Sequence, residues 1–110
     1  MENFGQLFRD FELMKVGVIG DVMLDTYIWG EVERISPEAP VPIVSLHHRE
    51  QRLGGAGNVA LNLRSLGAKP FIISVTGADD DAKCLMKLYT ENGIDTTYRF
   101  GSERRDTTNK

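Results

Sequence analysis

The chain has 110 residues, of which 41% are hydrophobic and 26% are charged, and its formal net charge is −3. This length fits one small domain with its own core, and the composition excludes a disordered tail, a collagen-like repeat and a coiled coil. The negative charge argues against a general nucleic-acid-binding protein.

The first half of the sequence predicts a helix, a strand and a projecting hairpin. An amphipathic packing helix is indicated by the spacing of Phe4, Leu7, Phe8, Phe11 and Met14. The apolar run 15–20 predicts a buried strand. Prolines at 37, 40 and 42 forbid a helix, so we predict two exposed strands joined by a proline-rich turn, forming a small lid over residues 27–50. The apolar side chains of this lid need cover from a ligand or another subunit.

The second half alternates helices with strands. Residues 54–67 predict a glycine-rich loop followed by a helix whose buried stripe is Val59, Leu63 and Leu66. A buried strand over 70–76, a helix over 79–92 and a third strand over 96–100 follow. Glycines at 67 and 93 end the two helices. We therefore predict an α/β fold with a parallel sheet flanked by helices.

The strongest local motif is Gly54-Gly55-Ala56-Gly57-Asn58. Its glycines let the backbone approach a ligand, the helix start offers free N–H groups, and Asn58 can both donate and accept hydrogen bonds to a sugar hydroxyl. A tight turn with an asparagine cap would show the same pattern. The spacing matches neither the dinucleotide-binding fingerprint nor the P-loop.

Asp21 and Asp25 follow the first predicted strand, where open α/β sheets bind ligands. They could bind hydroxyls or form a solvated turn. Arg104 and Arg105 could hold a phosphate, although solvated charge explains them better.

Three further motifs predict structural roles. Residues 79–81, all aspartates, favour a helix cap over a cation site. His47 and His48 should point to opposite faces of a strand and so cannot easily share a metal ion. Cys84 should be a packed thiol.

The compartment is indicated by two absences and one residue. No apolar run approaches the roughly 18 residues of a membrane span, and the start of the chain lacks the pattern of a signal peptide. A single cysteine, Cys84, cannot form an internal disulfide. We therefore expect a cytoplasmic protein with no membrane partner.

These motifs resemble the ribokinase-like sugar kinases, the PfkB carbohydrate kinase family. The family's first signature is matched by Gly54, Gly55, Ala56, Asn58, Ala60, Gly67 and Gly77. The run 18–25 is similar to the family's first strand and places its sugar-binding aspartate at Asp25. The resemblance covers essentially the whole chain. It implies an ATP- and Mg²⁺-dependent kinase whose sugar contacts are Asp25, Gly55 and Asn58, with Asp21 and Gly54 less central.

One subgroup is more similar still. The segments 20–25, 34–42 and 54–60 resemble the D-glycero-D-manno-heptose 7-phosphate kinases, the kinase part of a bifunctional heptose kinase/adenylyltransferase. The resemblance implies transfer of the ATP γ-phosphoryl group to the anomeric hydroxyl of heptose 7-phosphate, supplying ADP-heptose for the lipopolysaccharide core. It also implies that the lid covers the sugar and forms a homodimer contact.

Two departures from the family pattern are evident. Met23 stands where some ribokinases carry a sugar-binding asparagine. The second signature, a Gly-Ala-Gly-Asp loop with the general base and an anion hole, is missing. We therefore expect residues 1–110 to be the N-terminal, sugar-binding portion of a kinase domain, with no catalytic, nucleotide or metal ligand of its own and no activity alone.

Two alternatives remain open. The parent could phosphorylate another sugar, such as ribose, fructose or a nucleoside. The chain could instead be a non-catalytic binding or dimerisation module that uses the lid as its contact surface.

Overall fold

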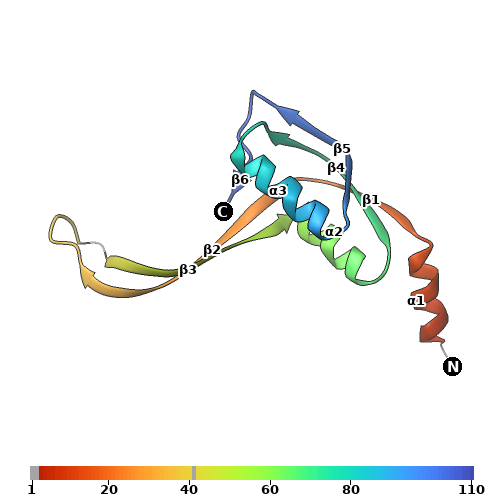
Figure 1. Cartoon of the computed structure of the whole chain (residues 1–110), viewed down its shortest axis with the longest axis horizontal. Coiled ribbons are helices and arrows are strands. Elements are labelled where there is room, and N and C mark those ends of the chain that lie inside the picture. The colour runs from red at the N-terminus through yellow and green to blue at the C-terminus, as the bar shows by residue number, and fades with distance from the viewer. Residues whose placement is uncertain (1–2, 41) are drawn as a thin grey trace.

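The computed structural model describes residues 3–40 and 42–110. They form two small sheets and three helices in an elongated molecule of 63 × 41 × 19 Å (Figure 1). In chain order the elements are α1 (Phe4–Glu12), β1 (Lys15–Ile19), β2 (Val22–Ile35), β3 (Pro42–Gly55), α2 (Ala56–Ser65), β4 (Lys69–Gly77), α3 (Asp80–Glu91), β5 (Asp95–Ser102) and β6 (Thr108–Asn109). No helix among the described residues is long and apolar enough to cross a membrane.

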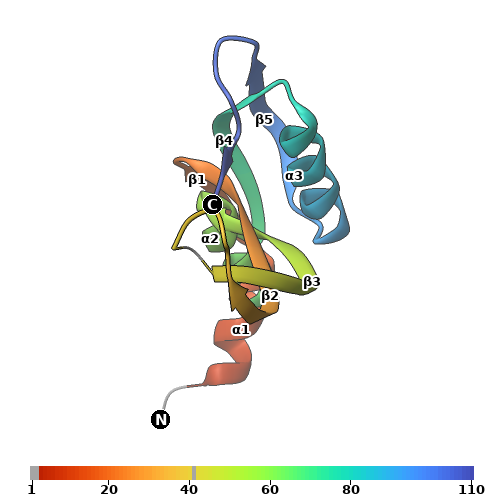
Figure 2. The same ribbon diagram turned by 90° about the vertical axis from the view of Figure 1, so that its left-hand side faces the viewer.

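The first sheet is parallel, with strand order β1-β4-β5, and confirms the predicted α/β fold. Helices α2 and α3 pack on one of its faces (Figure 2). On β4, alternate residues from Pro70 to Thr76 are buried against the helices, as expected for side chains that point to opposite faces along a strand. The core joins Val18 and Ile72 of the sheet to Leu85 and Tyr89 of α3.

The opposite face of this sheet carries exposed apolar side chains. Ile19 of β1 is 79% exposed and Phe100 of β5 is 62% exposed. The prediction that strand 15–20 is buried is therefore wrong for one of its faces, since Val18 alone in β1 is buried. A run of apolar residues identifies the strand but does not show which face is covered within this chain.

The second sheet is the predicted lid hairpin, with β6 added parallel to β2. The two long strands have 14 residues each and pair in antiparallel register from Val22↔Gly55 to Ile35↔Pro42. The hairpin thus begins before residue 27 and ends after residue 50, so its base reaches the core while its tip projects from the molecule (Figure 1). Leu24 and Leu53 at that base are buried.

The helix boundaries follow local signals. The side chain of Asp79 accepts a hydrogen bond from the Ala82 N–H at 2.9 Å and caps α3, as predicted. Gly67 and Gly93 follow α2 and α3 with φ angles of +101° and +68°, the left-handed region that glycine adopts without strain.

Two packing predictions for the helices are wrong. No residue of α1 is buried, and Phe4 and Phe8 on its apolar stripe are 62% and 49% exposed. On α2, Val59 is 49% exposed and Leu66 is 47% exposed, because the face that packs into the core carries Gly57 and Ala60 instead. The periodicity finds the helices, but the close approach of α2 to its neighbours favours its smallest residues.

Candidate functional site

The glycine motif forms a direct junction between β3 and α2, not the predicted loop. Gly55 is the last residue of β3 and the N-cap of α2, with φ +59° and ψ −133°, a conformation suited only to glycine. A Cβ at this position would lie 2.9 Å from Cε of Met23 and would also collide with the backbone oxygen of Asp21. That oxygen accepts a hydrogen bond from the Ala56 N–H at 2.8 Å, so Asp21 fixes the start of α2 through its backbone.

Gly54 makes room for the Asp25 carboxylate. A Cβ at Gly54 would lie 2.6 Å from Oδ2 of Asp25. Asp25 is half-buried and lies within β2, three residues past its start, so it is not part of a solvated turn, the alternative left open by the sequence. The hairpin, and not the end of the parallel sheet, therefore positions this carboxylate beside the start of α2.

Asp25 and Asn58 line one cavity of about 370 Å³, which is bounded by the base of the hairpin and by α2 and α3. Its wall also contains Arg52, Leu61 and Asn92. The structure thus brings together two of the predicted sugar contacts. Gly54 lies against Asp25, whereas Asp21 and Gly55 lie outside the cavity wall, at the strand-to-helix junction.

The side chains of Asp25 and Asn58 are free to bind a ligand. In the part of the chain that the structure describes, neither takes part in a side-chain hydrogen bond or an ion pair. Asp25 is half-buried, and polar groups that are partly withdrawn from water normally find partners within the protein, whereas Asn58 is exposed and needs none. An unpaired carboxylate and an unpaired amide on one cavity suit a ligand rich in hydroxyl groups.

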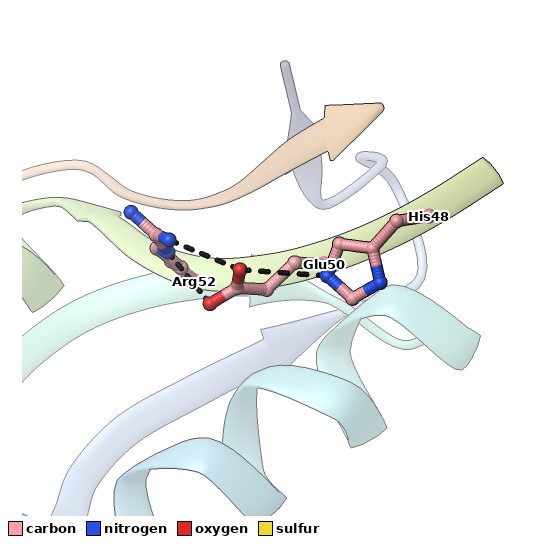
Figure 3. A network of polar contacts seen from close by, with 3 residues as sticks. All are labelled: His48, Glu50 and Arg52. Atoms are coloured by element: carbon pink, nitrogen blue, oxygen red, sulfur yellow. Dashed lines mark hydrogen bonds and ion pairs between the residues drawn. The ribbon is translucent and has the colours of Figure 1, made fainter. Parts of the chain in front are cut away.

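The sequence did not predict a second set of polar side chains at this cavity. Glu50 accepts two hydrogen bonds from Arg52, to Oε1 from Nε at 2.8 Å and to Oε2 from Nη2 at 3.0 Å (Figure 3). His48 lies on the other side of Glu50, with its Nε2 3.9 Å from Oε2. The guanidinium of Arg52 also lies 4.7 Å from the centre of the Tyr27 ring.

The ion pair shifts the pKa of each partner so that its charged form is favoured. The hydrogen bond from Arg52 lowers the pKa of Glu50, and the hydrogen bond to Glu50 raises the pKa of Arg52. Both groups therefore stay ionised at neutral pH. The sequence signal was the period-two spacing of residues 48, 50 and 52, which places them on one face of a strand. Only the register showed that this face carries Asp25 and Tyr27, the cross-strand neighbours of Arg52 and Glu50.

The remaining motifs have structural surroundings. His47 and His48 approach different carboxylates, Glu31 and Glu50, each at 3.9 Å, and no metal-binding group of three or more side chains occurs among the described residues. Cys84 is half-buried and its Sγ donates to Oε1 of Gln51 at 3.3 Å. Arg104 and Arg105 are exposed outside the cavity.

Residues 14–109 match the sequence profile of the pfkB family carbohydrate kinases. The chain belongs to this family. Among curated pfkB relatives, it is 54% identical over 82 residues to the D-beta-D-heptose 7-phosphate kinase of Bordetella bronchiseptica, covering 74% of this chain and 26% of the relative. It is 44% identical over 109 residues to the bifunctional protein HldE of Geobacter sulfurreducens, covering 99% of this chain and 22% of the relative. The chain thus spans about a fifth to a quarter of the length of these two relatives.

Solved structures show the same fold. A carbohydrate kinase from Agrobacterium tumefaciens superposes with a TM-score of 0.68 at 28% identity, covering 87% of this chain and 30% of that one. A putative ribokinase from the same organism superposes with a TM-score of 0.69 at 20% identity, covering 86% of this chain and 30% of that one. The ribokinase-like fold predicted from the motifs is confirmed.

Proposed function

We propose that these residues form the acceptor-binding part of a carbohydrate kinase whose acceptor is heptose 7-phosphate. The observation that carries this proposal is the pair of unpartnered side chains, Asp25 and Asn58, on one cavity at the glycine motif. A carboxylate accepts hydrogen bonds from sugar hydroxyls, and an amide both accepts and donates. Together they would distinguish hydroxyl stereochemistry, because a mismatched sugar that covers the half-buried Asp25 carboxylate would leave it without a hydrogen-bond partner.

The acceptor is suggested by the relatives. A pfkB member 54% identical to this chain is named a heptose 7-phosphate kinase, and that name agrees with the segments 20–25, 34–42 and 54–60 of the sequence. The proposed reaction moves the γ-phosphoryl group of ATP to the anomeric hydroxyl, and the product would supply ADP-heptose. Such transfers depend mainly on positioning and charge stabilisation. Asp25 and Asn58, supported by Gly54 and Gly55, would perform the positioning of the acceptor.

The donor side of the reaction is proposed to lie outside these 110 residues. None of the described residues forms a cluster that fits a Mg²⁺ site by itself, and we assign no ligand for ATP or Mg²⁺ here. The relatives are several times longer than the chain. The 110-residue polypeptide alone should therefore bind the acceptor weakly and transfer no phosphoryl group.

The hairpin is proposed to act as a lid over the acceptor and as a homodimer contact. Its exposed apolar side chains support this role: Ile28 is 62% exposed and Leu46 is 57% exposed. Tyr27 and Trp29 also stack on its surface, with ring centres 5.8 Å apart. Apolar strands that project from a domain are usually covered by a partner or a ligand. A cytoplasmic location, expected from the single cysteine, completes the proposal.

A substrate panel on the full-length protein tests the proposed function. Heptose 7-phosphate, ribose, fructose and a nucleoside are each incubated with ATP and Mg²⁺, and ADP release and the position of the new phosphate are measured. Phosphorylation of the heptose 7-phosphate at its anomeric hydroxyl is the expected result. A clear preference for another sugar would replace the acceptor, and no transfer to any sugar would refute the kinase proposal.

A further inference from the structure

The cavity at the glycine motif holds one cationic side chain, Arg52, among the described residues that line it. Arg52 is the cross-strand neighbour of Asp25, yet the two do not form an ion pair. The guanidinium turns instead to Glu50 on its own strand. The Asp25 carboxylate and the Arg52 guanidinium are therefore two separate binding groups of opposite charge on one cavity.

The guanidinium is held in place with one edge free. Glu50 takes the edge formed by Nε and Nη2, and the Tyr27 ring supports the planar group from 4.7 Å. Among the described residues, no hydrogen bond uses Nη1 of Arg52. Because a guanidinium has five N–H donors in a fixed fork, the edge formed by Nη1 and Nη2 can still bind a second oxyanion in bidentate fashion. Glu50 thus orients Arg52 without occupying all of its donors.

From this geometry we infer that Arg52 selects a phosphorylated acceptor by binding its phosphate monoester through the free guanidinium edge. The inference rests on the proposed function and deepens it. Arginine binds phosphate through paired, charge-assisted hydrogen bonds, and a half-exposed site leaves room for a phosphate group. Asp25 carries an unpaired negative charge on the same wall and would repel a phosphate placed beside it, whereas the charge of Glu50 is already paired with Arg52. The acceptor is therefore oriented with its hydroxyls at Asp25 and Asn58 and its phosphate at Arg52.

This division of roles agrees with an acceptor that has its phosphate at one end and the reacting hydroxyl at the other. A phosphate beside Asp25 would meet only a like charge, whereas a phosphate several bonds from the bound hydroxyls can reach the free guanidinium edge, where the attraction of Arg52 offsets the nearby carboxylates. Arg52 then contributes to the choice between a sugar phosphate and a free sugar. Asp25 and Asn58 contribute to the choice among sugars.

The test compares two acceptors in the full-length protein. Steady-state kinetics are measured for wild type and Arg52→Gln with heptose 7-phosphate and with unphosphorylated heptose. We expect Arg52→Gln to lower kcat/KM for the phosphorylated acceptor by about 10- to 100-fold, the range for a lost hydrogen bond to a charged group. The value of kcat/KM for the free sugar should fall much less, because a free sugar has no phosphate for Arg52 to bind. For the phosphorylated acceptor, kcat/KM of Arg52→Lys should lie between the values of wild type and Arg52→Gln, because a lysine keeps the charge but not the bidentate fork.

A matched control is available on the same strand. Arg49 is exposed and lies outside the cavity wall, on the opposite face of β3, so Arg49→Gln makes the same charge change away from the site. This control variant should leave kcat/KM unchanged for both acceptors. Equal losses for both acceptors in Arg52→Gln, or an equal selective loss in Arg49→Gln, would overturn the inference. If the wild-type enzyme prefers the free sugar, the kinase proposal stands but the inference about Arg52 is wrong. If the protein phosphorylates no sugar, both are wrong.

Discussion

Gly54 lies directly against the carboxylate of Asp25, at a distance that leaves no room for a Cβ. Gly54 is therefore required by the aspartate on the opposite strand, and Gly55 is required by the turn into α2. Only Gly55 needs the backbone conformation that is special to glycine, whereas Gly54 is needed because it has no side chain.

Gly54→Ala should displace the Asp25 carboxylate and weaken acceptor binding. The extra methyl group should also cost about 1–3 kcal/mol of stability, the range for overpacking a tight site. Urea unfolding measures the stability, and KM for the acceptor measures the displacement. Gly5→Ala is the control, because its Cβ would find ordinary contacts at 3.4 Å on an exposed helix and should leave KM unchanged. A Gly54→Ala enzyme with normal KM would contradict the assigned role of Asp25.

Asp25→Asn should reduce activity without reducing stability. The Asp25 side chain has no hydrogen bond or ion pair with any described residue, so its replacement breaks nothing in the fold. We expect kcat/KM of the full-length enzyme to fall by about 10- to 100-fold. The unfolding free energy should change by less than about 0.5 kcal/mol. Asp106→Asn, at an exposed position outside the cavity, should change neither quantity. A strongly destabilised Asp25→Asn protein would show that the carboxylate is structural.

Tyr89→Phe should keep or increase stability. Tyr89 is fully buried, and its hydroxyl has no hydrogen-bond partner among the described residues. Removing an unpaired buried hydroxyl is expected to be neutral or to stabilise by up to about 1 kcal/mol. Thermal unfolding at pH 7 measures the change. A marked loss of stability would indicate a hydrogen bond to Tyr89 in solution.

The same residue should make the wild type sensitive to alkaline pH. Burial raises the pKa of Tyr89 above its ordinary value, and nearby Arg99 offsets only part of that rise. The folded state therefore holds the proton at a pH where the unfolded chain releases it. This contribution is complete below the unfolded pKa of about 10 and declines as pH rises above it. Stability measured from pH 8 to 11 should fall less steeply for Tyr89→Phe than for wild type, and parallel curves would contradict the assignment.

Asp79 should contribute to the loss of stability of the fold at acid pH. Hydrogen bonds from Thr107, and then from the Ala82 N–H, lower the pKa of Asp79. A lowered carboxylate pKa adds stability that is present above the unfolded pKa and is lost as pH falls through the folded value. Asp79→Ala should therefore flatten the acid limb of the stability curve and speed amide exchange at Thr107, whose N–H donates to Asp79 at 2.8 Å. Glu103→Ala, at an exposed position away from this contact, should do neither.

The elements that sequence analysis predicted well are those with local causes. Strand β4 and helix α3 lie close to their predicted bounds, because Gly77 ends the strand, Asp79 caps the start of the helix and Gly93 follows its end. Strand β6 was not predicted, since two residues carry no periodicity. Its pairing with β2 depends on a distant strand.

The candidate site was predicted in part for the same reason. Asn58 and Gly55 could be found because their motif is contiguous. Arg52 could not, because its importance comes from a register that pairs it with Asp25 across 14-residue strands. The exposed apolar stripe of α1 shows what periodicity leaves open: it indicates that a helix has an apolar face but not what covers that face.

Strand β3 runs without interruption by a loop from beside the turn of the hairpin to Gly55, where α2 begins. The strand pairing breaks register twice along the hairpin, between Trp29 and Gly30 and between Val32 and Arg34. The base is held by the buried Leu24 and Leu53 and by the pairing of β6 with β2. Because irregular pairing is where a β-ribbon bends, movement of the tip would be taken up at these two breaks, and Asp25 would keep its place beside Asn58.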